Sequence, residues 1–157
     1  MAITVVIETA IARPTAEVYA VIADIESWPT WLIASGIIRV ERSADGPLVE
    51  GEHLVVEQRA AGRAGTFKAE VTALQPPTRL AVHGRDGDGV TIDIDAAVAP
   101  DAALAPDGDG TSLRWSIRIG LPLRFRMFES MARPQVERAA ALDIEALRRR
   151  LESTPPD

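Results

Sequence analysis

Between residues 37 and 121 the sequence repeats one pattern: a short apolar segment, then a cluster of Gly, Pro or Asp. The segments that this pattern predicts as strands span residues 37–42, 52–60, 66–74, 79–84, 90–98 and 112–121. Connections this short join antiparallel neighbours, because parallel strands need a long crossover. Residues 3–11 alternate in the same way, so the chain is expected to form an antiparallel sheet of about seven strands.

The last of these segments indicates that the sheet has one apolar and one polar face. Its apolar residues recur at every second position, and they are Leu113, Trp115, Ile117, Ile119 and Leu121. Arg114 and Arg118 lie between them and are expected to face water. Asp93 and Asp95 alternate with apolar residues in the preceding strand, so we expect them to pair with these arginines across strands.

Two helical blocks flank the predicted sheet. Pro14 is suited to a helix start, and Val18, Val21 and Ile22 follow it at helical spacing. Pro29 interrupts this block, so a second short helix is expected to follow, through about residues 32–34.

Near the C-terminus an apolar helical stripe is long enough to cover the apolar face of the sheet. The stripe consists of Val136, Ala140, Ile144, Leu147 and Leu151, and the opposite side carries Glu137, Arg138, Asp143, Glu145 and Arg148. Pro134 is expected to kink this helix or to mark the start of its regular part.

Composition and charge exclude several classes of function. A net charge of −6 disfavours general nucleic-acid binding, which requires a basic face. The chain has no cysteine and its two histidines are far apart, so neither a metal site nor a cofactor is expected. No apolar run reaches the length of a membrane span and the N-terminus has no basic segment, which predicts a cytoplasmic protein. The mixed charges of the polar face are compatible with a homodimer.

Four segments of the sequence together resemble a known superfamily. They are IARPTAEVYAVIADIESWPTW, VEGEHLVVEQ, FKAEVTALQPPTRL and the terminal amphipathic helix. Their order resembles the START/Bet v1-like (SRPBCC) superfamily of helix-grip proteins, in particular the bacterial polyketide cyclase/dehydrase-like members. The resemblance implies an α+β helix-grip fold: a curved seven-stranded antiparallel sheet wrapped on a long C-terminal helix, with two short helices after the first strand. It implies one domain over residues 1–152, followed by a flexible tail at residues 153–157.

A curved sheet and a single helix enclose a volume that is either a cavity or filled by large side chains. The expected function is binding of a hydrophobic, aromatic or lipid-like small molecule in an apolar cavity of a few hundred cubic ångströms. The candidate ligand-binding residues are Trp28, Trp31, Gln58, Phe67, Val71, Val82, Ile92, Ile94, Trp115, Ile117, Phe128 and Met131. By resemblance, Trp31 plugs the space between sheet and helix, and Trp28 either packs there or lies at the rim. If large residues fill the space instead, the fold serves as an interaction module.

The alternative function is a cyclase or dehydratase acting on a polyketide-like substrate, which requires a group that moves protons. Alternation places both His53 and His83 on the outer face of the sheet, so no catalytic residue is assigned. Gln58 is the best inward polar candidate in that register. A shift of one residue would replace it with Glu57 or Arg59.

Overall fold

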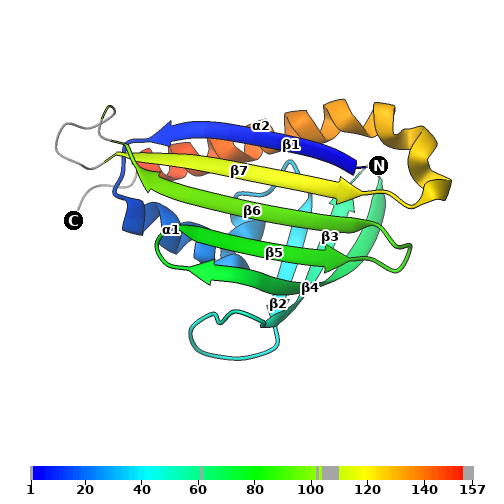
Figure 1. The fold of residues 1–157 in the computed structure, drawn as a ribbon, viewed down its shortest axis with the longest axis horizontal. Coiled ribbons are helices and arrows are strands. Elements are labelled where there is room, and N and C mark those ends of the chain that lie inside the picture. The colour runs from blue at the N-terminus through cyan, green and yellow to red at the C-terminus, as the bar shows by residue number, and fades with distance from the viewer. Residues whose placement is uncertain (1, 61, 102, 104–109, 154–157) are drawn as a thin grey trace.

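The structure is a computed structural model, and it describes residues 2–60, 62–101, 103 and 110–153. Seven strands form one antiparallel sheet in the order β1-β7-β6-β5-β4-β3-β2. The strands are β1 (Ala2–Ile11), β2 (Ile37–Arg42), β3 (His53–Ala60), β4 (Arg63–Gln75), β5 (Arg79–Arg85), β6 (Thr91–Pro100) and β7 (Thr111–Gly120). Figure 1 shows the sheet curving around one long helix, which confirms the predicted α+β helix-grip fold.

Four helical segments complete the fold. They are α1 (Thr15–Ala23), the 3-10 helix η1 (Ile25–Thr30), the 3-10 helix η2 (Leu123–Phe128) and α2 (Glu129–Ser153). α1 and η1 lie at one end of the sheet and η2 at the other, while α2 runs along β1 (Figure 1). Pro134 lies inside α2, so it neither begins nor ends the helix. Residues 154–157 of the predicted tail lie outside the described residues.

The start of one strand and the position of one short helix differ most from the sequence-based prediction. β4 begins at Arg63, three residues earlier than expected, because Ala60 pairs directly with Arg63 across a tight hairpin. The second short helix covers Ile25–Thr30 and includes Pro29, where a helix starting after that proline was expected.

The apolar stripe of α2 is buried against the sheet, as predicted for most of its residues. Ala140, Ile144 and Leu147 are each at most 2% exposed. Asp143 was expected on the solvent side of the helix but is also only 2% exposed. Its burial has a specific cause in the neighbouring loop, described with the site below.

All three tryptophans of the chain meet in the core at the end closed by η1. The ring centroids of Trp28 and Trp31 lie 6.4 Å apart, and those of Trp31 and Trp115 lie 5.4 Å apart, both edge to face. The indole N–H of Trp28 donates to the carbonyl oxygen of Ile22 at 2.8 Å. Trp28 and Trp31 are each 1% exposed, so Trp28 is packed and does not lie at a rim.

The polar face of the sheet carries cross-strand charge pairs, but with partners other than those predicted. Asp95 binds Arg79 at 2.8 Å, and Asp93 lies 2.6 Å from the His83 ring nitrogen. Both partners are on β5, whereas β7 had been expected to supply Arg114 and Arg118. β6 lies between β5 and β7, so each aspartate has neighbours on both sides and alternation alone does not choose between them.

A buried ion pair joins Arg42, the last residue of β2, to Glu52, the residue directly before β3. Glu52 is 5% exposed, and its carboxylate accepts hydrogen bonds from Arg42 Nε at 2.7 Å and from Nη2 at 2.9 Å. These bonds lower the pKa of Glu52. The pair therefore stabilises the fold above the ordinary pKa of a glutamate, and that contribution is lost as pH falls through the lowered pKa of the folded state.

Replacing this carboxylate should produce a pH-dependent loss of stability. Glu52→Gln is expected to lower the free energy of unfolding by about 2 kcal/mol at pH 7, since one buried charged partner is lost. Urea denaturation between pH 7 and pH 3 should show the difference from the wild type shrinking as pH falls. Glu41→Gln is the control, because the Glu41 pair with Arg39 is exposed and should contribute less than about 1 kcal/mol. A loss that is the same at both ends of the pH range would contradict the prediction.

Candidate ligand-binding site

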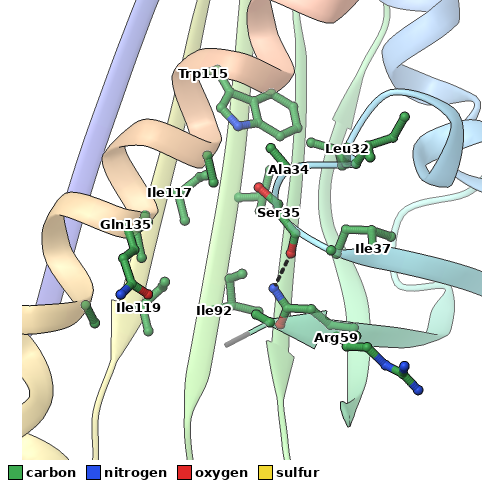
Figure 2. Close-up of a pocket in the computed structure, with 18 residues that line it drawn as sticks. Leu32, Ala34, Ser35, Ile37, Arg59, Ile92, Trp115, Ile117, Ile119 and Gln135 are labelled. Carbon is green, nitrogen blue, oxygen red and sulfur yellow. Dashed lines mark hydrogen bonds between the residues drawn. The ribbon is translucent and has the colours of Figure 1, made fainter. Parts of the chain in front are cut away.

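A pocket of about 390 Å³ lies between α2, the sheet and the loop that joins η1 to β2. Figure 2 shows the side chains around it. Its lining consists of Leu32, Ile33, Ala34, Ser35, Gly36, Ile37, Gln58, Arg59, Ala60, Ile92, Ile94, Trp115, Ile117, Ile119, Ala132, Gln135, Val136 and Ala139. Trp115 is fully buried, whereas Ile33, Arg59 and Gln135 are exposed, so the pocket runs from the tryptophan cluster out to solvent.

The sheet wall of the pocket is apolar because two neighbouring strands alternate in phase. β6 contributes Ile92 and Ile94, and β7 contributes Ile117 and Ile119. The register pairs Ile92 with Ile119 and Ile94 with Ile117, so the four side chains share one face. The sheet therefore offers a continuous hydrocarbon surface.

The helix wall explains why space remains at this point. Ala132, Val136 and Ala139 are spaced four and three residues apart, which puts them on one face of α2. Two of the three are alanines, and their small side chains do not reach across to the sheet. Further along the helix the larger Ile144 and Leu147 fill the equivalent space.

The loop that forms the third wall of the pocket is hydrogen-bonded to the buried carboxylate of Asp143 on α2. The backbone N–H of Ala34 donates to Asp143 Oδ1 at 2.7 Å, and that of Ser35 donates to Oδ2 at 2.9 Å. Burial raises the pKa of Asp143, while these N–H bonds and the Ser35 side chain oppose that shift. Asp143 thus positions the pocket wall without itself lining the pocket.

The pocket lining has few polar side chains, and the amide of Gln58 is already hydrogen-bonded within the protein. Gln58 Nε2 donates to the carbonyl oxygen of Ser35 at 2.8 Å, the dashed bond in Figure 2. Arg59 is the one ionisable residue of the lining, and its guanidinium points away from the pocket (Figure 2). Gln135 contributes an amide near the exposed end.

The structure brings together five of the twelve residues predicted to bind a ligand. The five that line the pocket are Gln58, Ile92, Ile94, Trp115 and Ile117. Five others are buried elsewhere in the core: Trp28, Trp31, Phe67, Val71 and Val82. Phe128 and Met131 lie on the surface, 49% and 67% exposed, because η2 and the first turn of α2 extend past the end of the core. Whether the twelve residues contact a ligand stays a prediction.

Sequence reasoning missed the loop at residues 33–36 and the helix residues Ala132, Gln135 and Ala139. Ala132 could have been found, because Ala132 and Val136 continue the stripe of Ala140 at four-residue spacing. The loop has no periodicity, and the contact that holds it to Asp143 joins residues 109 positions apart.

Neither histidine approaches the pocket. His53 and His83 are both exposed, as the alternation predicted. Over residues 2–60, 62–101, 103 and 110–153, no group of three or more His, Asp or Glu side chains could hold a metal ion. No helix in that part of the chain is long and apolar enough to cross a membrane.

The chain matches one known protein family, and its fold is similar to those of solved structures. The sequence model of a family described as polyketide cyclase/dehydrase and lipid transport matches residues 2–152. No curated protein matches the chain. The fold is similar to that of a START superfamily protein from Mycobacterium smegmatis, with a TM-score of 0.76, 15% identity and coverage of 95% of this chain and 97% of that one. It is also similar to the Zhui aromatase/cyclase from Streptomyces sp. R1128, with a TM-score of 0.74, 17% identity and coverage of 97% and 94%.

Proposed function

The chain belongs to the polyketide cyclase/dehydrase and lipid transport family, and from this premise we propose that it binds a hydrophobic, ring-containing small molecule in the pocket beside α2. The observation that carries the proposal is the continuous apolar wall of Ile92, Ile94, Ile117 and Ile119 facing a space of about 390 Å³. A volume in this range suits a small organic ligand. A cytoplasmic location and a homodimer stay predictions from the sequence.

The expected affinity follows from the apolar surface that such a ligand would bury. At about 25 cal/mol per Å², burial of roughly 300 Å² supplies about 7 kcal/mol, before the cost of association is subtracted. Micromolar binding needs a net free energy of about 8 kcal/mol, so apolar burial alone gives weaker binding and polar contacts must add to it. The loop at residues 33–36 is already fixed by Asp143, so little further free energy is lost in ordering that wall.

Filling the pocket from the helix side should abolish binding. Ala139 lines the pocket from α2, so Ala139→Trp is expected to weaken binding of the neutral fluorescent probe N-phenyl-1-naphthylamine more than tenfold, because the indole would take the place of the ligand. The measurement is a titration of probe fluorescence with wild-type and variant protein, each checked for folding by circular dichroism.

Ala141→Trp provides a matched control, since Ala141 lies two residues further along the same helix and is exposed. It should leave probe affinity within about twofold of the wild type. If both variants bind the probe like the wild type, the probe occupies another surface and the proposal is wrong. The exposed apolar residues around η2, including Met127 and Phe128, would then be the next place to look.

A cyclase or dehydratase reaction in the same pocket is the second candidate, favoured by the description of the family. Proton transfer needs a titratable group within hydrogen-bond reach of the substrate. Apart from Arg59, whose guanidinium points away from the pocket, the lining offers the amides of Gln58 and Gln135, which position a substrate but do not titrate. Turnover of a polyketide-like substrate that is lost in Gln58→Leu, with folding intact, would favour this candidate over simple binding.

A further inference from the structure

Trp115 has a buried hydrogen-bond donor that the protein does not use. The residue is 0% exposed, and its indole Nε1 has no hydrogen-bond partner among the described residues. Trp28 sits in the same cluster, yet its indole N–H is bonded to Ile22. A donor left unpaired in an apolar environment costs about 1–3 kcal/mol, so a core position of this kind is normally filled by a residue without one.

The unused donor of Trp115 is directed at the pocket. Trp115 is part of the lining, and Figure 2 shows the nitrogen on the edge of the ring turned toward Ala34 and Ile117, two other lining residues. Trp31 also has an unpartnered indole N–H, but it is not part of the lining. Of these two donors, only the one on Trp115 belongs to a lining residue; its nitrogen has almost no accessible surface in this structure, so an acceptor in the pocket reaches it once the lining shifts slightly.

We propose that the ligand places a neutral acceptor oxygen, such as the carbonyl of an aromatic ketone, on Trp115 Nε1 at the inner end of the pocket. This inference rests on the proposed function and specifies the class of ligand. A hydrogen bond made in this dry site removes the cost of the unpaired donor. The site therefore discriminates against hydrocarbons of the same shape that lack the oxygen.

The surroundings of Trp115 favour a neutral oxygen over a carboxylate. The lining residues labelled beside the ring in Figure 2 are Leu32, Ala34 and Ile117, which are apolar, and the guanidinium of Arg59 points away. The N–H groups of Ala34 and Ser35 are already bonded to the carboxylate of Asp143. A ligand carboxylate at the inner end would lose its hydration without gaining a cation, which is far more costly than burying a carbonyl.

The other end of the pocket adds a second element of selectivity. Gln135 lies at the exposed end, where its amide can bond a hydroxyl or carbonyl of the same ligand. Between Trp115 and Gln135 the walls are isoleucines and alanines. A ring system with oxygen substituents at both ends fits this distribution of polar groups.

The test compares two probes that differ by one carbonyl, fluorene and 9-fluorenone. The wild-type protein is expected to bind 9-fluorenone about tenfold more tightly than fluorene, measured by calorimetric or fluorescence titration. In Trp115→Phe this ratio should fall to about one, because phenylalanine keeps an aromatic ring but has no donor. Trp31→Phe is the control, since it removes a buried unpartnered N–H that does not line the pocket and should leave the ratio unchanged.

A folding defect in Trp115→Phe would also change the ratio of the two affinities. A second, spectroscopic measurement is therefore made on the protein with Trp115 in place. The three tryptophans give three indole N–H signals in a nitrogen-15 spectrum. The Trp115 signal, identified by elimination with Trp28→Phe and Trp31→Phe, is expected to move downfield with 9-fluorenone and not with fluorene. A purely structural role for Trp115 would produce no difference between the two probes.

The outcomes separate this inference from the proposed function. If both probes bind equally well and the Trp115 signal responds to both alike, the pocket binds hydrophobic molecules but the inference is wrong. If neither probe binds, the proposed function fails and the inference with it. Tighter binding of fluorene-9-carboxylate than of 9-fluorenone would overturn the choice of a neutral ligand.

Discussion

Gly36→Ala is expected to lower the free energy of unfolding by about 3 kcal/mol and to remove probe binding. Gly36 has a φ of 76°, a conformation that costs an alanine roughly 1–2 kcal/mol. An added Cβ would lie 1.9 Å from the carbonyl oxygen of Arg59, which is backbone and cannot rotate away. Relief requires β2 and β3 to separate locally, with loss of the 2.8 Å bond from Arg59 N–H to the Gly36 carbonyl. Both residues line the pocket, so its shape changes as well.

Gly46→Ala separates backbone strain from the close approach at Gly36. Gly46 has a φ of 85°, and nothing lies within 4 Å of a Cβ built on it. It should therefore cost about 1 kcal/mol and leave probe affinity unchanged. The measurements are urea denaturation and probe titration for the wild type and the two variants. Equal losses of stability in both would mean that the contact with Arg59 is easily relieved, and the prediction would be wrong.

The sheet could be predicted from sequence because its pattern is local. Alternation with a period of two assigned the buried residues of β7 correctly, including Leu113, Trp115 and Ile117. Short turns between successive segments required antiparallel neighbours, and the strand order β7-β6-β5-β4-β3-β2 follows the chain without a crossover. Pattern and connection length together were sufficient for the antiparallel sheet, whereas the helix-grip arrangement was implied by the family resemblance and the place of β1 beside β7 follows from neither pattern nor connection length.

The pocket could be predicted only in part, because its position depends on contacts between distant residues. Phe128 and Met131 were expected inside since large apolar side chains usually are. The structure leaves both exposed, because the segment that carries them extends beyond the sheet. Conversely, Ala132 and Ala139 matter through the small size of their side chains, and a list of large apolar residues does not include them.

Asp143 illustrates the same limit for a charged residue. In the helical pattern it lies among Glu137, Glu145 and Arg148, which predicts a solvated face. The periodicity of a helix does not reveal which loops pack on it. Here the loop at residues 34 and 35 lies over the helix and donates two hydrogen bonds to Asp143. A buried carboxylate requires such donors, so its presence in the core is explained only once the loop is in place.

Replacing this carboxylate should loosen the pocket wall and destabilise the fold together. Asp143→Ala is expected to lower the free energy of unfolding by about 3 kcal/mol, because the N–H groups of Ala34 and Ser35 lose their acceptor in a largely dry site. Probe affinity should fall at least tenfold, since the ligand would have to order a loop that Asp143 now holds in place. Urea denaturation and probe titration on the same preparation measure the two effects.

Glu137→Ala is the control for helix propensity and net charge, because it removes one exposed acidic residue from the same helix. It should change both quantities little. Asp143→Asn keeps the shape of the side chain but turns an amide donor toward one of the two N–H groups, so its stability should lie between those of the wild type and Asp143→Ala. If Asp143→Ala loses stability but binds the probe as the wild type does, the loop keeps its place without the carboxylate. Asp143 would then serve the fold alone, and the pocket wall would depend instead on the Gln58 bond to Ser35 and on the close contact of Gly36 with β3.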